Sequence, residues 1–221
     1  MQLSEILDRL AAAVFPRRCL QCSDVIEYDR FLCAKCRLVR VGRVTLPFPN
    51  RLSDVASVCV YGDESRPLIL KIKDASEPRV YTFFAGEMHR LLTQLWPDAS
   101  FDLIVPVPTT QAKMEARGFN QADLLAEPLS KLLGIPTYPH ALLREAHSRE
   151  QHTLSSEQRR ENAGLSYKIN QPDEVCGKTV LLLDDLLTTG YTASACANCL
   201  LDAGAAKVYA LTCAATPLAS R

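Results

Sequence analysis

The residues with the clearest chemical potential are two adjacent aspartates, Asp184 and Asp185, in the segment 180–192, which reads VLLLDDLLTTGYT. The four apolar residues in front of them are typical of a central parallel strand that is buried on both faces. Open α/β sheets bind their ligands beyond the carboxyl ends of such strands. The order of residues therefore predicts two carboxylates at a ligand-binding edge.

A small polar run follows the aspartates, where the next helix should begin. Its hydroxyl groups, and backbone N–H groups that Gly190 allows to approach closely, would form a cradle for a phosphate at the positive end of that helix. Two carboxylates would repel a ligand made only of phosphates. A sugar phosphate fits better, with its ribose hydroxyls on the acids and its 5′-phosphate in the cradle. The predicted contacts are Asp184, Asp185, Leu187, Thr188, Thr189, Gly190, Tyr191 and Thr192.

At all thirteen positions this segment resembles the signature loop of the type I phosphoribosyltransferases, which bind phosphoribosyl pyrophosphate. One alternative is the Walker B strand of a nucleotidase, which needs a Walker A loop elsewhere. The tripeptide Gly177-Lys178-Thr179 does not supply one, because Pro172 stands where that motif needs glycine and the tripeptide precedes a strand. The other alternative is a core strand followed by an ordinary turn.

Four cysteines near the start, Cys19, Cys22, Cys33 and Cys36, have the spacing C-x2-C-x10-C-x2-C. Two such knuckles bring four thiolates into a tetrahedron suited to a structural Zn²⁺ ion. A short segment with few large apolar residues needs the folding free energy that the metal would contribute. Two disulfides or a redox pair are the alternatives, and the lack of a secretory signal weakens the first of them. Cys196 and Cys199 fall among alanines on a helix and are expected to be packing residues.

The composition is that of a globular intracellular protein. The 221 residues, 48% of them hydrophobic, suffice for one α/β domain and a small appendage. The formal charge is zero, although residues 1–51 hold nine Lys/Arg against five acids, which predicts a modest basic patch there. No apolar run approaches the length of a membrane span. A reducing cytoplasm is the expected compartment.

Strand-like and helix-like patterns alternate, which predicts a doubly wound, mostly parallel sheet, the type I phosphoribosyltransferase fold. A short amphipathic helix is expected over 3–14 and a proline-rich linker over 46–50. We accordingly expect an N-terminal helix and zinc-ribbon module over 1–46 and a phosphoribosyltransferase-like domain over 51–221. Strands are expected at 55–61, 102–107, near 136–139, at 165–169, from 180 up to the two aspartates, and at 207–213, with helices at 66–73, 79–95, 118–133 and from the polar run to 203.

A second resemblance lies in the segment 105–133, which is similar to the RGFNQ-containing stretch of the ComF/GntX family of phosphoribosyltransferase-like proteins. Its proline-rich turn at Pro108 and Thr109 would present backbone N–H groups to a pyrophosphate, and Lys113 and Arg117 would supply cations. The run Lys-Met-Glu-Ala at 113–116 departs from the more arginine-rich family pattern. That departure weakens the case for a strongly basic surface that would bind the phosphates of DNA here.

Further family positions fall on Lys73 and on the polar stretch 144–162. Taken alone, the stretch could be a solvated loop and Lys73 a solvated helix charge. The resemblance implies instead that Arg144, Gln151 and Arg159 belong to a flap that closes over pyrophosphate and excludes water. Lys73 would then reach the same pyrophosphate.

The ComF resemblance implies a role in natural competence or in the use of imported single-stranded DNA, with competence-machinery proteins as further partners. Phosphoribosyl pyrophosphate would be the ligand, bound with Mg²⁺. If the protein is an enzyme, it is a phosphoribosyltransferase that releases pyrophosphate, with Asp184 and Asp185 in the catalytic role. A nucleobase-salvage phosphoribosyltransferase and a non-catalytic sensor of the sugar pyrophosphate are the alternatives.

Overall fold

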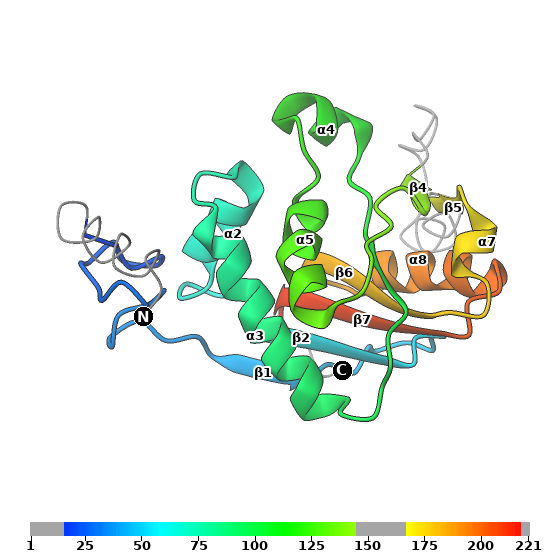
Figure 1. The fold of residues 1–221 in the computed structure, drawn as a ribbon, viewed down its shortest axis with the longest axis horizontal. Helices are drawn as coiled ribbons and strands as arrows, with labels where there is room; N and C mark the ends of the chain where they lie inside the picture. Colours follow the sequence, from blue (N-terminus) through cyan, green and yellow to red (C-terminus); the bar gives the residue numbers. More distant parts are fainter. Residues whose placement is uncertain (1–15, 145–166, 218–221) are drawn as a thin grey trace.

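Five strands form a central sheet in the order β1-β2-β7-β6-β3 (Figure 1). The computed structural model describes residues 16–144 and 167–217. β2, β7, β6 and β3 are mutually parallel, and β1 joins the edge of β2 in the antiparallel sense. The expected mostly parallel α/β sheet is confirmed. The strands are β1 (Arg40–Arg43), β2 (Asp54–Val60), β3 (Leu103–Pro106), β6 (Thr179–Leu187) and β7 (Lys207–Ala215).

Helices cover both faces of this sheet. On one face, α3 (Arg79–Leu95) packs against α5 (Gln121–Leu133), and α2 (Arg66–Asp74) packs on α3. On the other face, α8 (Tyr191–Asp202) lies on β6 and β7. Each face has its own cluster of buried apolar side chains, because the central strands are buried on both sides. This arrangement is the doubly wound architecture that the alternating pattern predicts.

The chain leaves β3 and β6 toward opposite faces of the sheet. After β3 it runs to α5 on one face, and after β6 it runs to α8 on the other. The two strands are neighbours, paired from Leu103↔Val180 to Pro106↔Leu183. A crevice therefore opens between their carboxyl ends, the position at which open α/β sheets bind ligands.

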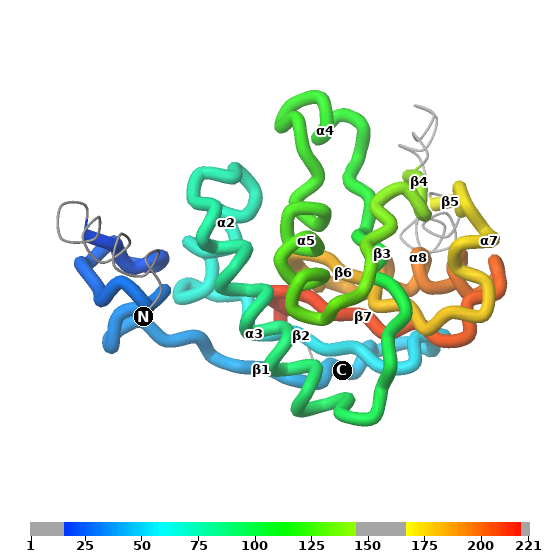
Figure 2. The backbone as a smooth tube through the Cα atoms, in the orientation of Figure 1, coloured from blue at the N-terminus to red at the C-terminus, as the bar shows by residue number. Residues whose placement is uncertain are grey.

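The region after β3 differs from the expectation of one helix over 118–133. A short helix α4 (Gln111–Arg117) comes first, and α5 begins only at Gln121. Gly118 separates them with a left-handed conformation (φ 79°) that ends α4. Figure 2 shows the backbone of α4 projecting beyond the end of the sheet.

The two remaining expected strands lie outside the central sheet. Near residues 136–139 there is a single parallel bridge, Ile104↔Thr137, beside β3. The described part of the expected strand 165–169 is β5 (Tyr167–Ile169), which pairs antiparallel with β4 (Leu142–Arg144) in a separate two-stranded sheet. A one-turn helix, α7 (Pro172–Val175), then leads to β6.

The segment expected to be a proline-rich linker is packed onto the body. Leu46 is buried, and the Phe48 ring stacks on Tyr191 at the start of α8. β1, which the sequence did not predict, precedes this segment in the central sheet. The division of the chain at residues 46–51 remains a prediction, and the expected N-terminal helix lies outside the described residues. In the part of the chain described here, no helix is both long and apolar enough to cross a membrane.

Candidate functional site

A cavity of about 210 Å³ lies between the carboxyl ends of β3 and β6. Side chains from α2, α4, α5, β4, β6 and α8, together with the turn after β3, line it. Nine residues singled out from the sequence meet there, although they are spread over 120 positions of the chain. They are Lys73, Pro108, Thr109, Lys113, Arg117, Arg144, Asp184, Asp185 and Thr192.

The two aspartates reach the cavity because β6 extends beyond the end of β3. The last paired residue is Leu183, opposite Pro106, so Asp184 stands just beyond the edge that β3 covers. The sequence predicted that the strand would end at the aspartates. β6 instead continues to Leu187, paired with β7, so both aspartates lie within the strand. The Asp185 backbone N–H donates to Asp184 Oδ1 over 2.8 Å. Asp185 is 5% exposed, and its Oδ2 is buried without a hydrogen-bond partner.

Both acidic and basic side chains line the cavity. Burial raises the pKa of Asp184 well above its ordinary value, and the neighbouring carboxylate of Asp185 raises it further. The four basic residues that line the same cavity, Lys73, Lys113, Arg117 and Arg144, outnumber the two acids. A ligand with both hydroxyl groups and anionic groups would satisfy both sets.

The basic side chains come from three elements that flank the sheet end. Lys73 lies in the last turn of α2, Lys113 and Arg117 lie on α4, and Arg144 ends β4. α4 has no buried residue, so packing does not explain its presence. Its N-cap is Thr110, whose hydroxyl accepts a hydrogen bond from the Lys113 N–H over 3.3 Å. α4 thus places two cations, Lys113 and Arg117, at the cavity.

The structure accounts for the Gly-Phe-Asn-Gln run at 118–121. Asn120 is 5% exposed, its amide donates to the Val107 carbonyl (3.1 Å) and to Asp123 Oδ1 (2.9 Å), and its oxygen accepts the Ala122 N–H (3.4 Å). One side chain thus caps α5 and holds the turn after β3. Gln121 lines the cavity and accepts a hydrogen bond from Arg117 over 3.4 Å.

The signature loop turns sharply from β6 into α8. Gly190 has φ 83° and is the N-cap of α8, and a Cβ added to it would lie 2.5 Å from Leu46 Cδ2. The left-handed conformation disfavours any other residue there, and a Cβ would also force the Leu46 side chain to move. Thr188 and Thr189 are exposed. A second, smaller space of about 30 Å³ lies beside the loop, and its lining includes Leu187, Thr188, Gly190, Asp184 and Thr192.

Tyr167 belongs to the surroundings of the site but was not singled out from the sequence. It is the cross-strand partner of Arg144, whose guanidinium lies 5.4 Å from the centre of its ring. Tyr167 is 6% exposed, and its buried hydroxyl has no hydrogen-bond partner. Burial, with a smaller effect of Cys196, raises its pKa to about 12. No sequence signal pointed to it, because its role depends on the pairing of β4 with β5.

Two predicted flap residues, Gln151 and Arg159, lie outside the described residues. For the other site residues, the assignment to particular parts of a ligand stays a prediction.

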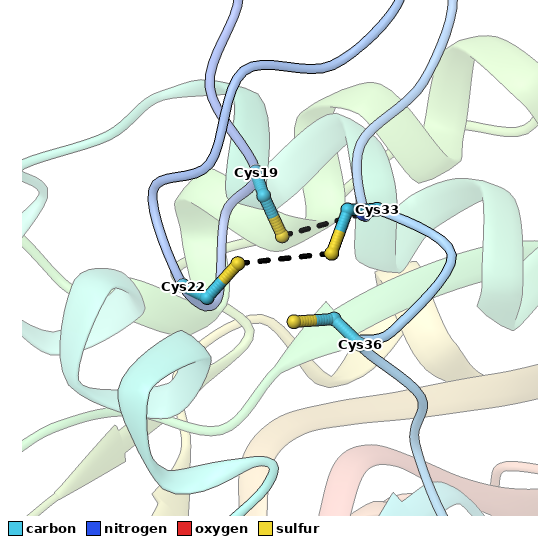
Figure 3. A group of neighbouring side chains, drawn as sticks. All are labelled: Cys19, Cys22, Cys33 and Cys36. Carbon is cyan, nitrogen blue, oxygen red and sulfur yellow. Dashed lines mark hydrogen bonds between the residues drawn. The ribbon is translucent and has the colours of Figure 1, made fainter.

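The four predicted cysteines form a candidate metal site away from the cavity. Their sulfur atoms all lie within 4.8 Å of one another, and Figure 3 shows them pointing toward a common centre from two loops. Cys22 Sγ and Cys33 Sγ are 3.7 Å apart. Sulfurs bound tetrahedrally to one zinc at about 2.3 Å would be about 3.8 Å apart, which matches this spacing.

The loops that carry these thiols are held to the body of the protein. Leu20 is fully buried in the same apolar cluster as Phe84 of α3, and its N–H donates to the Phe31 carbonyl over 2.9 Å. Arg79, at the start of α3, donates to the Arg18 carbonyl over 3.1 Å. Cys196 and Cys199 lie on α8, where Cys196 is fully buried and Cys199 is half-buried, as packing residues should be.

Curated proteins with similar sequences are named for competence and DNA utilization, and the chain matches no protein-family model. It is 31% identical over 180 residues to competence protein ComFC of Bacillus subtilis, covering 81% of this chain and 71% of that protein. It is 32% identical over 203 residues to DNA utilization protein YhgH of Escherichia coli K12, covering 86% of each. Over 92 residues it is 37% identical to competence protein F of Haemophilus influenzae, covering 41% of this chain and 40% of that one.

Solved structures with similar backbones include a phosphoribosylpyrophosphate amidotransferase and a phosphoribosyltransferase. Glutamine phosphoribosylpyrophosphate amidotransferase of B. subtilis is 19% identical, with 75% of this chain and 32% of that chain covered and a TM-score of 0.44. Adenine phosphoribosyltransferase of Saccharomyces cerevisiae is 15% identical, with 63% and 72% covered and a TM-score of 0.42. At these TM-scores the likeness decides nothing, and the fold class rests on strand order and register.

The repulsion between the two aspartates leads to a prediction about stability. Asp185→Asn should raise the free energy of unfolding by about 1 kcal/mol at pH 8, because it removes a buried charge that raises the pKa of Asp184. An aspartate whose pKa is raised on folding costs stability above its unfolded pKa. The gain should therefore shrink as the pH falls through about 4, the unfolded pKa of an aspartate, below which the raised pKa of Asp184 no longer costs stability.

Urea unfolding of the wild type and the variant at both pH values measures this effect. Asp98→Asn, at an exposed position, is the matched control and should change the unfolding free energy little at either pH. A loss of stability in Asp185→Asn at pH 8 would contradict the inference that repulsion between the two carboxylates destabilises the folded protein.

Proposed function

This chain belongs to the ComF family, and we propose that it binds phosphoribosyl pyrophosphate and acts in natural competence or in the use of imported single-stranded DNA. The names of its relatives support the cellular role. The observation that carries the ligand is the cavity at the carboxyl ends of β3 and β6, where two carboxylates face four cations beside a glycine-built helix start. We also propose a cytoplasmic location, in keeping with nine free cysteines.

The residues present fit this ligand and its Mg²⁺ ion. The unpartnered Oδ2 of Asp185 is a buried acceptor that ribose hydroxyls or a magnesium-bound water would satisfy. The loop that we assign to the 5′-phosphate turns at Gly190, which has a left-handed conformation and where a Cβ would lie 2.5 Å from Leu46 Cδ2. Asp184 and Asp185 would hold the ribose and the Mg²⁺, and bound Mg²⁺ would offset the charge of the pyrophosphate.

If the protein is catalytic, the bond that breaks joins the anomeric carbon of the ribose to a pyrophosphate oxygen. Pyrophosphate leaves with the electron pair, and positive charge develops on the anomeric carbon and the ring oxygen. The two carboxylates would stabilise that charge while they hold the ribose hydroxyls. Lys113, Arg117 and Arg144 would stabilise the departing pyrophosphate.

The two alternatives differ in what they require of the site. A nucleobase-salvage enzyme needs a surface that stacks on the base, and among the described residues that line the 210 Å³ cavity none is aromatic. A non-catalytic sensor needs the ligand-binding residues but no acceptor. Because the described site offers a ligand cavity without a base platform, we rank the competence-related role above salvage.

Pyrophosphate release from phosphoribosyl pyrophosphate and Mg²⁺, with calorimetric titration of the same ligand, tests this proposal. The assay is run with free nucleobases and with single-stranded DNA as separate acceptors. Release only with DNA would identify the acceptor, and release only with a base would make the protein a salvage enzyme. Binding without release would identify a sensor, and no binding would refute the proposal.

In the same assay Asp185→Asn should weaken the binding of phosphoribosyl pyrophosphate at least about tenfold, because it removes a charged acceptor for the ribose. Asp98→Asn, the exposed control, should bind as the wild type does. Since Asp185→Asn is expected to be the more stable protein, unfolding cannot explain the loss. Unchanged affinity would remove this aspartate from the proposed site.

We propose that the four-cysteine site binds structural zinc, since four thiolates at this spacing form a closed tetrahedral set. The purified chain should hold one zinc ion, and Cys22→Ser should lose it and lower the melting temperature of the protein, because metal binding contributes to folding. Metal analysis and thermal melting measure both. Cys176→Ser, at another exposed thiol, should keep the zinc, and retention of zinc by Cys22→Ser would contradict the assignment.

For single-stranded DNA we propose the cleft between the metal-site loops and α3. It has a volume of about 610 Å³ and is lined by Arg30, Arg37, Arg40, Phe31 and Phe83. Arg30 pairs with Glu27 and Arg40 with Glu87, whereas Arg37 is exposed and has no ion pair within the described residues. Arg37 is therefore the cation most available to a DNA phosphate.

Arg37→Glu should weaken the binding of a thymidine oligonucleotide about tenfold at low salt and flatten its salt dependence, because a phosphate contact is replaced by repulsion. Fluorescence anisotropy at several salt concentrations measures this. Lys207→Glu makes the same charge change at an exposed position at the start of β7 and should have a smaller effect. Equal losses in both variants would show that only net charge matters and would remove the cleft from the proposal.

A further inference from the structure

The segment 46–52, between β1 and β2, lies against the turn from β6 into α8. We infer that Leu46 and Phe48 are positioning residues that form the outer wall of the signature loop and hold it in the shape that binds a sugar phosphate. This inference rests on the proposed function of the loop. It assigns a role in the ligand site to a segment that carries no chemical group of its own.

The first contact is between Leu46 and Gly190. Leu46 is 7% exposed, and its two terminal methyl carbons would lie 2.5 and 3.0 Å from a Cβ at position 190. The leucine therefore occupies the space in which any side chain at the N-cap of α8 would stand. The backbone at Gly190 can keep its left-handed conformation (φ 83°) close against this wall, and movement of the loop toward it is blocked.

The second contact fixes the next residue of the loop. The Phe48 and Tyr191 rings are stacked, with centroids 4.5 Å apart and planes 14° apart. Tyr191 is the first residue of α8 and lies at the positive, N-terminal end of that helix. A ring stack on this residue fixes the direction in which that end of the helix points.

The segment itself is held in place without regular structure. Pro47 and Pro49 restrict the backbone on either side of Phe48. The Asn50 side-chain amide donates to the Phe48 carbonyl over 3.2 Å, and its oxygen accepts the Leu52 N–H over 3.1 Å. Phe48 is therefore presented to Tyr191 by a stiff support and does not depend on the loop for its position.

Both ends of the segment are anchored on other elements. The Val44 N–H donates to the Val55 carbonyl of β2, and the Ser53 N–H donates to the Val208 carbonyl of β7, each over 2.8 Å. Arg51 forms an ion pair with Asp202, the last residue of α8. The segment thus spans α8 from its N-cap to its final turn, and a change at Phe48 acts first on the N-terminal end.

This placement separates the two ends of the proposed ligand. The wall supports only the side of the site that we assign to the 5′-phosphate. The cations assigned to pyrophosphate lie on α4 and β4, and among the described residues no hydrogen bond or ion pair joins those elements to this segment. Loss of the wall should therefore weaken the binding of a sugar phosphate and leave the binding of pyrophosphate nearly unchanged.

Calorimetric titration of the full chain with ribose 5-phosphate and, separately, with pyrophosphate and Mg²⁺ tests the inference. Phe48→Ala should weaken ribose 5-phosphate binding by about fivefold or more, with pyrophosphate affinity unchanged within about twofold. Phe48→Tyr keeps the ring and should restore both affinities. Leu52→Ala is the matched control, because Leu52 packs against the same apolar cluster at the amino end of β7, away from the loop.

The outcomes distinguish this inference from its premise. If Leu52→Ala and Phe48→Ala lower the melting temperature similarly but only Phe48→Ala affects ribose 5-phosphate, the positioning role is supported. Equal loss of both probes in Phe48→Ala, no loss of either, or failure of Phe48→Tyr to restore binding would overturn it. If the wild type binds neither probe, the proposed function of the site fails, and this inference fails with it.

Discussion

β6 lies between β3 and β7, and because all three strands are parallel, their carboxyl ends meet at one edge of the sheet. β3 ends opposite Leu183, so the next two residues of β6 extend beyond it with their carboxylates toward the crevice. The chain leaves β3 and β6 toward opposite faces, which keeps that crevice open. The helix α4 with Lys113 and Arg117, the strand β4 with Arg144, and the signature loop are all arranged around this one strand pairing.

The site contains groups that do not favour the folded state by themselves. Asp184 is deprived of solvent next to another carboxylate, and the Asp185 Oδ2 atom and the Tyr167 hydroxyl are buried without partners. Asn120, which lines the same cavity, instead satisfies several hydrogen bonds at once. Gln21, Arg79 and Asn198 also hold buried polar atoms without partners, but Asp185 lines the cavity, where a ligand can supply the missing partner. Under the proposed function, the hydroxyl groups of the sugar would be that partner.

The N-terminal part of the chain is tied into the body at several points. Leu20 enters the apolar cluster under α3, β1 extends the central sheet, and Leu46 closes against the signature loop. The metal-site loops form one wall of the arginine-lined cleft, whose other wall is α3. A metal that orders these loops would therefore also order the cleft. The cysteine module, the N-terminal wall of the arginine-lined cleft and the segment against the signature loop are consecutive along one stretch of sequence.

The sequence by itself determined the features that depend on local order: the mostly parallel α/β class, the ComF family, the four-cysteine cluster, and the helices expected at 66–73 and 79–95. It also named nine of the thirteen residues that line the cavity, because family motifs mark positions even when their geometry is unknown. Only the tertiary structure showed that Asn120 ties α5 to the turn after β3, that Tyr167 lies under Arg144, and that residues 46–48 support Gly190 and Tyr191. These contacts join residues far apart in the chain, or depend on which strands pair, and no local pattern of side chains records such distances.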